Sequence, residues 1–409
     1  MKSAFQAETH GIVSTTPKPR TKPLRVLVVH NQYQQAGGED AVVKDECALL
    51  EKNGVSVKLY RQHNRQIEDM PRLQVALDTI WSQRTVAEIG DLCERFRPDV
   101  IHAHNTFPLI SPSLYFAARE HHVPVVQTLH NFRLFCAQAM FLRDGKICED
   151  CIGTVPWRGV LHRCYRNSAV QSAVVVGMQG IHRALGSYRR EVTRYIALNQ
   201  FCRDKFIQAG LPGERISIKP NFVDLPPPSW QQRHGALFVG RLSQEKGIST
   251  LGEAAMLYPE AQLTVIGTGP EQPLIQGRRN IRLMGWQQPP AITQHMQQAA
   301  YLVMPSLWYE NFPRTLVEAY ACGLPVIASR LGAMAELVKD GVTGLLFDPG
   351  DANDLVKKMR WADSQPEAIQ RMGWAARQEY EQKFTPETNF SQLMGIYGEA
   401  IRDRMGERE

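Results

Sequence analysis

The chain lacks any stretch approaching the ~20 consecutive apolar residues that are needed to cross a bilayer. Its most apolar segment, residues 172–181, has roughly half that length and is followed by His182 and Arg183. The first 23 residues contain Thr, Pro, Lys and Arg but no apolar core, which excludes an ordinary secretory signal and favours a flexible tail. We therefore expect a cytoplasmic protein that does not span a membrane.

The composition also lacks the biases of disordered or fibrous chains, since 43% of the residues are hydrophobic and 22% are charged. A length of 409 residues exceeds what one hydrophobic core usually serves, so two domains are expected.

The net charge of +6 comes from the first half of the chain, where residues 1–200 contain 25 Lys and Arg against 18 Asp and Glu. One run of arginines beside the apolar segment is opposed only by Glu191: Arg158, Arg163, Arg166, Arg183, Arg189, Arg190 and Arg194. This run is either a solvated helix face or a peripheral contact with anionic lipid at the inner face of a membrane, at about 1 kcal/mol per residue. No nucleic-acid reading motif accompanies it, so nucleic acid is not an expected partner.

Short runs rich in β-branched residues predict buried parallel strands that alternate with helices, the first of which spans residues 39–53. In the first half these strands are residues 24–30, 55–59, 100–103, 123–129 and 195–198. In the second half they are residues 236–239, 262–266, 281–284, 301–304, 325–328 and 344–347. The expected fold class is α/β, with two Rossmann-like domains whose parallel sheets face a shared cleft.

The boundaries follow from the breaks in this alternation. After the tail, residues 24–222 form the N-terminal domain, and residues 223–235, with three successive prolines, form a linker. Residues 236–384 form the C-terminal domain. Residues 385–409 are expected to form a helix that packs back on the first domain, because its apolar residues recur at helical spacing.

The segment ENFPRTLVE, residues 310–318, follows a predicted strand and places two carboxylates, Glu310 and Glu318, eight positions apart. Asn311 is expected to cap a helix that has Pro313 in its first turn, with Phe312 between them. Free N–H groups at that helix start would bind an anion such as a diphosphate. Taken alone, two such carboxylates are more often solvated surface groups.

Two further loops follow predicted strands of the second half. FVGRLSQEKG supplies two cations, Arg241 and Lys246, where leaving-group charge would develop. VIGTGPE supplies Gly267 and Gly269, which suit close backbone approach by a nucleotide. Each loop alone is ordinary, and their order and spacing together are informative.

With these motifs, the sequence from about residue 24 to residue 401 resembles the family 4 retaining glycosyltransferases of GT-B architecture, and among them bacterial members that build surface polysaccharides. The resemblance implies that Arg241 and Lys246 bind the donor diphosphate, that Glu310 holds the donor sugar and that Glu318 holds the ribose. It implies that the early glycine loop is Gly37 and Gly38. This chain has ENFP in place of the commoner EGFG.

The resemblance also makes the N-terminal domain the acceptor side and His130, in TLHN, the histidine of the cleft. His130 ends a predicted strand, where we expect it beside the anomeric carbon. His102, His104 and Asn105 end a neighbouring strand and are expected to line the acceptor side.

The chain contains no D-x-D sequence, the usual ligand set of the divalent cation in some transferases. We therefore expect a metal-independent hexosyltransferase that needs no cofactor beyond its GDP- or UDP-linked sugar donor. The nucleoside diphosphate would leave as an acceptor hydroxyl attacks from the same face and passes its proton to a donor phosphate oxygen. The expected acceptor is a glycan or a polyprenyl-diphosphate-linked oligosaccharide in exopolysaccharide, capsule or O-antigen synthesis. The alternatives are a catalytically inactive nucleotide-sugar-binding scaffold and a sugar-nucleotide epimerase.

Four of the eight cysteines cluster in the segment 136–164, as Cys136, Cys148, Cys151 and Cys164. In a cytoplasmic chain they are not expected to form structural disulfides. Four thiolates in one loop predict a structural zinc ion next to His130, and the alternative is a set of buried or redox-active thiols.

Overall fold

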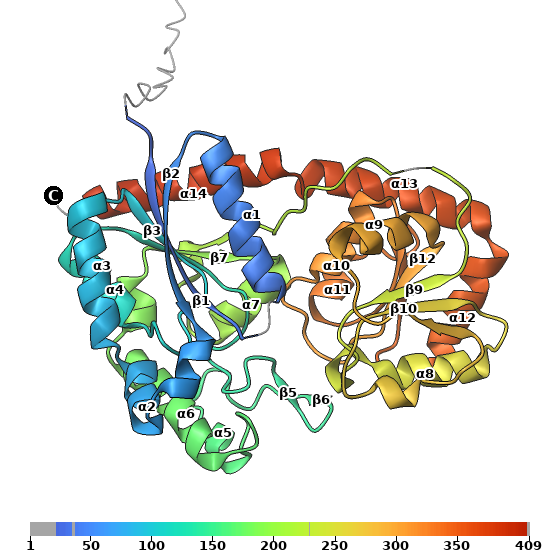
Figure 1. Ribbon diagram of the computed structural model, residues 1–409, viewed down its shortest axis with the longest axis horizontal. Helices are drawn as coiled ribbons and strands as arrows, with labels where there is room; N and C mark the ends of the chain where they lie inside the picture. Colours follow the sequence, from blue (N-terminus) through green and yellow to red (C-terminus); the bar gives the residue numbers. More distant parts are fainter. Residues whose placement is uncertain (1–21, 35–36, 229, 407–409) are drawn as a thin grey trace, which may run out of the picture.

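The computed structural model describes residues 22–34, 37–228 and 230–406, which form two α/β domains side by side (Figure 1). Nearly all of the predicted tail, residues 1–23, lies outside the described residues. None of the described helices has the length and apolar character that a membrane span requires.

Each domain is built on a six-stranded, wholly parallel sheet. The first sheet has the order β2-β1-β3-β4-β7-β8 and the second β11-β10-β9-β12-β13-β14. The strands of the first sheet are β1 (Arg25–Gln32), β2 (Ser56–His63), β3 (Val100–Ala103), β4 (Val125–Thr128), β7 (Arg194–Ala197) and β8 (Ile216–Ile218). Those of the second are β9 (Ala236–Val239), β10 (Leu263–Ile266), β11 (Ile281–Leu283), β12 (Tyr301–Met304), β13 (Val326–Ser329) and β14 (Gly344–Phe347).

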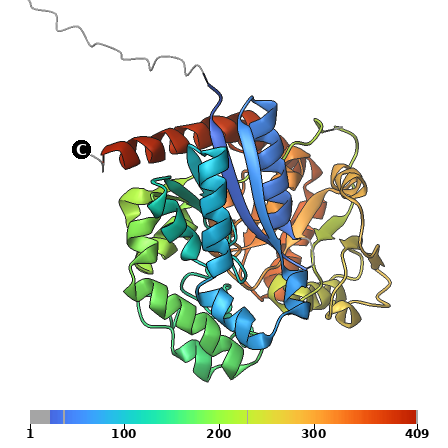
Figure 2. The ribbon, with the colours of Figure 1, turned by 60° about the vertical axis from the view of Figure 1, so that its left-hand side comes forward.

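Helices cover both faces of each sheet (Figures 1 and 2), because right-handed crossovers that proceed in both directions from one strand place their helices on opposite faces. The first domain contains α1 (Gly38–Lys52), α2 (Arg72–Ile80), α3 (Gln83–Phe96), α4 (Ser113–Glu120), α5 (Arg158–Leu161), α6 (Ala169–Ala184), α7 (Gln200–Gln208) and the short helices η1 (Asn64–Asp69), η2 (Ser187–Glu191) and η3 (Gly213–Arg215). The second contains α8 (Ile248–Leu257), α9 (Pro289–Gln298), α10 (Arg314–Ala321), α11 (Gly332–Leu337), α12 (Ala352–Ser364), α13 (Pro366–Lys383) and the short helices η4 (Gln244–Lys246) and η5 (Gln272–Leu274). The helix α14 (Pro386–Gly406) follows the second domain in sequence.

The predicted α/β fold class with two parallel sheets is confirmed. The predicted strands agree with the structure to within two residues at each end, except β2, which extends four residues further than predicted, to His63. The edge strand β8 was missed because three residues are too few to show a periodic pattern.

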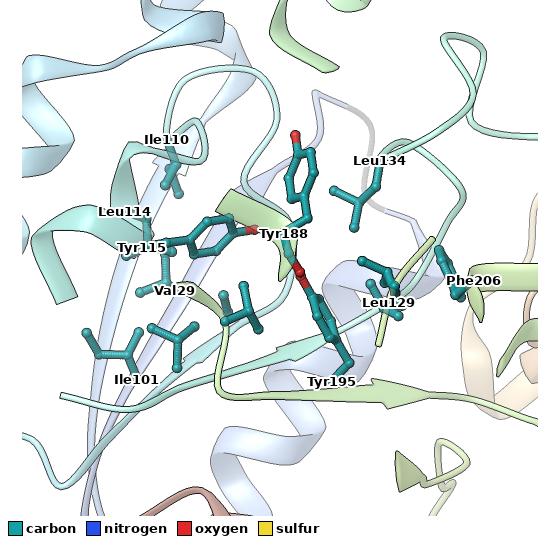
Figure 3. Packing of buried hydrophobic residues seen from close by; sticks show 14 of the residues in the cluster. Val29, Ile101, Ile110, Leu114, Tyr115, Leu129, Leu134, Tyr188, Tyr195 and Phe206 are labelled. Carbon is teal, nitrogen blue, oxygen red and sulfur yellow. The ribbon is translucent and has the colours of Figure 1, made fainter. Parts of the chain in front are cut away.

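The core of the first domain lies between the sheet and the helices α3 and α4 (Figure 3). Tyr195, on β7, points into this core, and its hydroxyl donates a 2.7 Å hydrogen bond to the carbonyl of Tyr188. Because the buried phenol has a partner, the ring can fill the space next to Leu129 without an unsatisfied polar group.

The opposite face of the first sheet is covered by α14, which runs from the second domain back across the first (Figures 1 and 2). Its apolar side chains Leu393 and Tyr397 are fully buried in a cluster with Val26, Val28 and Val126 of the sheet. The last helix therefore belongs to the core of the domain that is first in sequence.

The strand orders locate the ligand-binding edge. In each sheet, successive strands are added in one direction and then in the other, and the change falls between β1 and β3 in the first sheet and between β9 and β12 in the second. Open parallel sheets bind ligands outside the carboxyl ends of the strands at such switch points. A ligand-binding site is therefore expected in the loops after these four strands.

Candidate active site

The loops after β9 and β12 bring together a cation and a carboxylate. Lys246 Nζ lies 2.6 Å from Glu310 Oε1, and the Ser306 hydroxyl donates a 2.8 Å hydrogen bond to the same oxygen. Gly247, at φ +71°, makes this approach possible, because a Cβ there would lie 1.9 Å from the carbonyl oxygen of Pro305. Lys246 and Glu310, which were predicted separately as site residues, thus meet at the switch point of the second sheet.

Arg241 lies on the same loop but has other contacts. Its guanidinium forms an ion pair with Glu245, and its Nε lies 3.2 Å from the Ser243 hydroxyl. The side chain is 63% exposed, so one face of the guanidinium remains open to solvent.

Gly267 and Gly269 have a packing role. A Cβ on Gly267 would lie 1.9 Å from the carbonyl oxygen of Gly240, and one on Gly269 would lie 2.2 Å from that of Leu242. The loop after β10 therefore lies directly against the cation-bearing loop after β9. Contact of these glycines with a nucleotide stays a prediction.

Asn311 does not cap a helix, so that prediction is wrong. The helix α10 begins three residues later, at Arg314, with Pro313 in the cap position. The Asn311 amide instead donates a 3.1 Å hydrogen bond across the cleft to the carbonyl of Leu129, and Asn199 donates to the Asn311 carbonyl. A cap would have needed Oδ1 of Asn311 as an acceptor, and this atom instead accepts a hydrogen bond from the thiol of Cys202 in the first domain.

The hydrogen bonds that Asn311 makes with Leu129 and Asn199 form a clamp between the domains, and Phe312 points into the second domain next to this clamp. Its ring packs edge to face on Phe384 with the centroids 6.1 Å apart, at the margin of the second domain's core. It anchors the loop between Asn311 and α10.

Glu318 lies on α10 and faces α1 of the first domain. It accepts a 3.0 Å hydrogen bond from Arg314, whose guanidinium also donates to Asp45 of α1 at 2.8 Å. Burial raises the pKa of Glu318 despite the opposing charge of Arg314. These three side chains border an interdomain cavity of about 500 Å³ between α1, the linker, α9 and α10.

The glycine loop opens α1. Gly37 is the cap residue, and its N–H donates to the Asp40 carboxylate at 2.9 Å. Asp40 also lies 2.7 Å from His30 Nε2, at the end of β1. A Cβ on Gly37 or Gly38 would meet nothing within 4 Å, so both glycines border open space.

Glu39, in the first turn of α1, accepts a 3.0 Å hydrogen bond from the hydroxyl of Tyr33. Burial raises the pKa of Glu39 to about 7, despite the opposing charge of His30. A titrating carboxyl therefore stands beside the helix N-terminus at which an anion would bind.

His130 is the outer member of a buried histidine row. Its Nε2 lies 2.9 Å from Nδ1 of His104, and His104 Nε2 lies 3.4 Å from Glu46 Oε1. Burial lowers the pKa of His104 to about 3 and that of His130 well below its ordinary value, and the proximity of other histidines adds to both shifts. Both imidazoles are therefore neutral at pH 7.

Glu46 is the anchor of this row. Its other oxygen lies 3.0 Å from the ammonium of Lys219, which also donates to Asn389 of α14. Burial alone would raise the pKa of Glu46, but the charges of Lys219 and His102 hold it well below its usual range. Glu46, His102 and His104 lie close enough to share a metal ion, yet the buried ammonium already supplies the positive charge there.

The prediction that His102 lines the acceptor side is wrong, because its side chain is fully buried against the Tyr397 hydroxyl of α14 at 2.7 Å. Asn105 donates a 2.7 Å hydrogen bond to the carbonyl of Asn31 and lines a small hollow together with His104 and His130, so an acceptor-side role for Asn105 and His104 stays a prediction. His102 points to the α14 face of the sheet because side chains alternate along β3.

The four clustered cysteines line one small hollow in the segment after His130. Cys136 is buried, and the other three are half-buried.

Sequence reasoning missed several residues of this region: Glu46, Lys219, Arg314, Asn199 and Tyr33. Glu46 had a detectable signal, because it lies four residues after Val42 and three before Leu49 on the apolar face of α1. A carboxylate in that position requires a buried partner. Nothing in the sequence indicates that the partner is Lys219, 173 positions away.

Comparison with known proteins agrees with this architecture. Residues 36–226 match the model of Glycosyltransferase Family 4, and residues 230–379 match that of Glycosyl transferases group 1. The chain is 28% identical over 332 residues to the glycogen synthase of Mycobacterium tuberculosis, covering 77% of this chain and 71% of that one. It is 23% identical over 340 residues to the 2-deoxystreptamine N-acetyl-D-glucosaminyltransferase of Niallia circulans, covering 79% and 82%.

Among solved structures, Anabaena Alr3699/HepE in complex with UDP-glucose is similar with a TM-score of 0.63 and 19% identity, over 92% of this chain and 99% of that one. The sucrose-phosphate synthase of Thermosynechococcus elongatus is similar with a TM-score of 0.67 and 16% identity, over 91% and 98%. Both likenesses concern the fold. Fold and sequence together define this protein as a GT-B glycosyltransferase.

Within that class the chain belongs to the family 4 glycosyltransferases, as its motifs and both family matches agree.

Proposed function

We propose that this glycosyltransferase moves a hexose, with retention of configuration, from a nucleotide-sugar donor to a glycan or lipid-linked oligosaccharide. The clamp between Asn311 and Leu129 carries the proposal. Glu310 and His130 are the chain neighbours of these two residues, so the clamp holds a sugar-binding carboxylate and a neutral imidazole at one place in the cleft. One group comes from each domain, as a reaction between a donor and an acceptor requires.

The donor diphosphate would bind to Lys246, Arg241 and the free N–H groups at the start of α10. On binding, Lys246 would exchange its contact with Glu310 for a phosphate oxygen, which frees Glu310 to accept a hydrogen bond from a sugar hydroxyl. The cations would stabilise the leaving diphosphate as the acceptor hydroxyl attacks from the same face, and a phosphate oxygen would take the proton. These groups would replace a divalent cation, so we propose a metal-independent reaction.

Relatives support a role in polysaccharide synthesis. The chain is 28% identical over 180 residues to a lipopolysaccharide 1,6-galactosyltransferase of Salmonella typhimurium and 25% identical over 241 residues to the amylovoran biosynthesis glycosyltransferase AmsK of Erwinia amylovora. These likenesses, which cover 40% and 52% of this chain, support our proposal of a role in the synthesis of an exopolysaccharide, capsule or O-antigen.

The test is product formation from a panel of radiolabelled GDP- and UDP-linked sugars with glycan and lipid-linked acceptors, with and without EDTA. We expect transfer from one donor with its anomeric configuration retained, at equal rates in both conditions. Binding of a donor that is released unchanged with every acceptor would contradict transfer and indicate a scaffold.

Two substitutions separate the roles within the site. Glu310→Gln should slow transfer while nucleoside-diphosphate binding stays within about twofold, because it removes a contact with the sugar alone. Lys246→Ala should weaken binding of the diphosphate far more than binding of the nucleoside. Arg84→Ala, at an exposed ion pair on α3, is the control for loss of a positive charge. Equal loss of sugar transfer and diphosphate binding in Glu310→Gln would refute its assigned role.

We also propose that α5 and the start of α6 contact an anionic membrane. Trp157, Leu161 and Val170 are 57%, 65% and 76% exposed, and the Arg158 guanidinium lies over the Trp157 ring. Part of the arginine run has other partners, since Arg194 forms ion pairs with Glu399 and Asp403. The contact would therefore be mainly apolar, with fewer cations than the sequence suggests.

Co-sedimentation with vesicles tests this contact. The protein should bind vesicles that contain phosphatidylglycerol, and the double variant Trp157→Ser/Leu161→Ser should bind at least fivefold more weakly. The double variant Leu73→Ser/Leu77→Ser, in exposed positions on α2, is the matched control. Equal loss in both double variants would refute a contact specific to α5.

A further inference from the structure

We propose that Cys136, Cys148, Cys151 and Cys164 hold one structural zinc ion that fixes the segment 136–164 against the cleft. The four side chains come from three different turns of this segment and line a single hollow of about 20 Å³. Zinc prefers four thiolates in a tetrahedron, with Zn–S distances of about 2.3 Å. Among the described residues, no three of these sulfurs lie within 4.8 Å of one another, so the ion would draw them together to roughly 3.8 Å, as that tetrahedron requires.

The segment has little regular structure that could hold it in place. Its strands β5 (Leu142–Arg143) and β6 (Lys146–Ile147) have two residues each, and α5 has four. Ala139, Phe141 and Asp144 adopt left-handed backbone conformations, which cost free energy for residues other than glycine. A segment of this kind needs a further source of stability, and a metal cross-link supplies it.

The surrounding charges favour a metal thiolate centre. Four thiolates and one Zn²⁺ leave a net charge of −2. Two arginines, Arg158 and Arg143, line the same hollow and would compensate part of that charge, since Arg143 also forms an ion pair with Asp150 at 2.8 Å. His162 also lines it but is exposed, so the less exposed cysteines are the better ligand set.

The segment 136–164 contacts the second domain close to the proposed donor site. The turn between β5 and β6 reaches the second domain (Figure 1), where a Cβ on Gly145 would lie 3.1 Å from the side-chain nitrogen of Gln244. Glu149, between two of the cysteines, lies 2.6 Å from Lys205 and accepts a hydrogen bond from Tyr309. Gln244 and Tyr309 are close in sequence to Lys246 and Glu310.

The zinc ion would therefore support the wall of the cleft at two points next to the proposed donor site. This consequence rests on the proposed function, whereas the presence of the ion does not. A measurement of metal content keeps the two separate, because an inactive protein could still contain zinc.

The experiment measures metals in the full chain, purified from zinc-supplemented cells without a metal-affinity step, by inductively coupled plasma mass spectrometry. We expect close to one zinc per chain and no stoichiometric iron. The double variant Cys148→Ser/Cys151→Ser should lose the zinc. The variant Cys47→Ser, which changes a half-buried cysteine on α1, should retain it.

Titration of the unmodified protein with a mercurial, with released zinc detected by a chromogenic chelator, covers the case in which the double variant does not fold. Zinc should be released as the most protected four thiols react. A zinc-free protein, stoichiometric iron, or zinc retained in the folded double variant would each overturn the assignment.

Discussion

The charge of Lys219 is expected to be essential for stability, although the residue lies far from the cleft surface. Lys219 and Glu46 form an ion pair whose side chains are 1% and 2% exposed. Replacing Lys219 by Met roughly keeps the length of the side chain and removes its ammonium group. The Glu46 carboxylate is then buried without its positive partner. Breaking a buried pair in this way costs about 3–5 kcal/mol, against about 0–1 kcal/mol for an exposed pair.

The destabilisation should depend on pH in a defined direction. Lys219 is one of the charges that hold the pKa of Glu46 well below its usual range, so the ionised carboxylate contributes stability above its unfolded pKa and loses it as the pH falls. In Lys219→Met the buried carboxyl takes up a proton instead, which relieves the unpaired charge at low pH. The difference in unfolding free energy between the two proteins should therefore be larger at pH 8 than at pH 5.

Urea unfolding followed by circular dichroism measures these differences, and hydrogen exchange of α1 and β8 assigns them to the first domain. The control is Arg84→Met, which breaks an ion pair on α3 whose arginine is 61% exposed. The double variant Lys219→Met/Glu46→Gln should recover at least about 1.5 kcal/mol relative to the sum of the single variants, since it buries no unpaired charge. Equal losses in Lys219→Met and Arg84→Met, or strict additivity in the double variant, would refute the reasoning.

Three further outcomes are expected. Binding of nucleoside diphosphate, measured by calorimetry, should weaken as the pH rises through about 7, because ionised Glu39 adds negative charge at the start of α1. Glu39→Gln should abolish this dependence, and the same pH profile in the variant would contradict the role of Glu39. Gly267→Ala should lower the free energy of unfolding by more than about 2 kcal/mol, since its Cβ would overlap a neighbouring carbonyl. The control Gly277→Ala, at an open position with positive φ, should lower the free energy of unfolding by less, and equal losses in the two variants would contradict the packing role. Arg314→Ala should raise the KM for the donor more than it lowers kcat, because it removes the ion pair that holds Glu318 and the ion pair with Asp45 of the other domain. A change in kcat alone would count against a role of Arg314 in donor binding.

The sheets were predictable because buried parallel strands read as short runs of β-branched residues. The strands at residues 100–103, 236–239, 301–304 and 344–347 were predicted with the bounds that the structure has. The meeting of Lys246 and Glu310 also followed from sequence, since both come directly after strands that border the same switch point.

Contacts across the cleft were not predictable, because they depend on how the two domains face one another. Asn311 has the residue type of a helix cap and stands close before a helix, yet its amide binds Leu129 of the other domain. His102, on β3, and His104, just after it, look alike in the sequence. Both lie next to Glu46, at 3.0 and 3.4 Å, but His102 also contacts the Tyr397 hydroxyl of α14, whereas His104 contacts His130 at the cleft.

The distribution of contacts indicates which of them yields when the cleft admits a donor. The domains meet at the cleft through several polar contacts, which include the Asn311 amide, the bonds from the backbone N–H groups of Gln200 and Phe201 to Glu336, and the partly exposed ion pair of Arg314 with Asp45. Such bonds contribute about 0.5–1.5 kcal/mol each. The helix α14 is held on the first sheet by fully buried side chains such as Leu393 and Tyr397, each worth about 1.5–3 kcal/mol. Opening should therefore break the cleft contacts while α14 stays in place. Asn389 and Tyr397 hold Lys219 and His102 from that same helix, so the histidine row behind His130 keeps its geometry whether the cleft is open or closed.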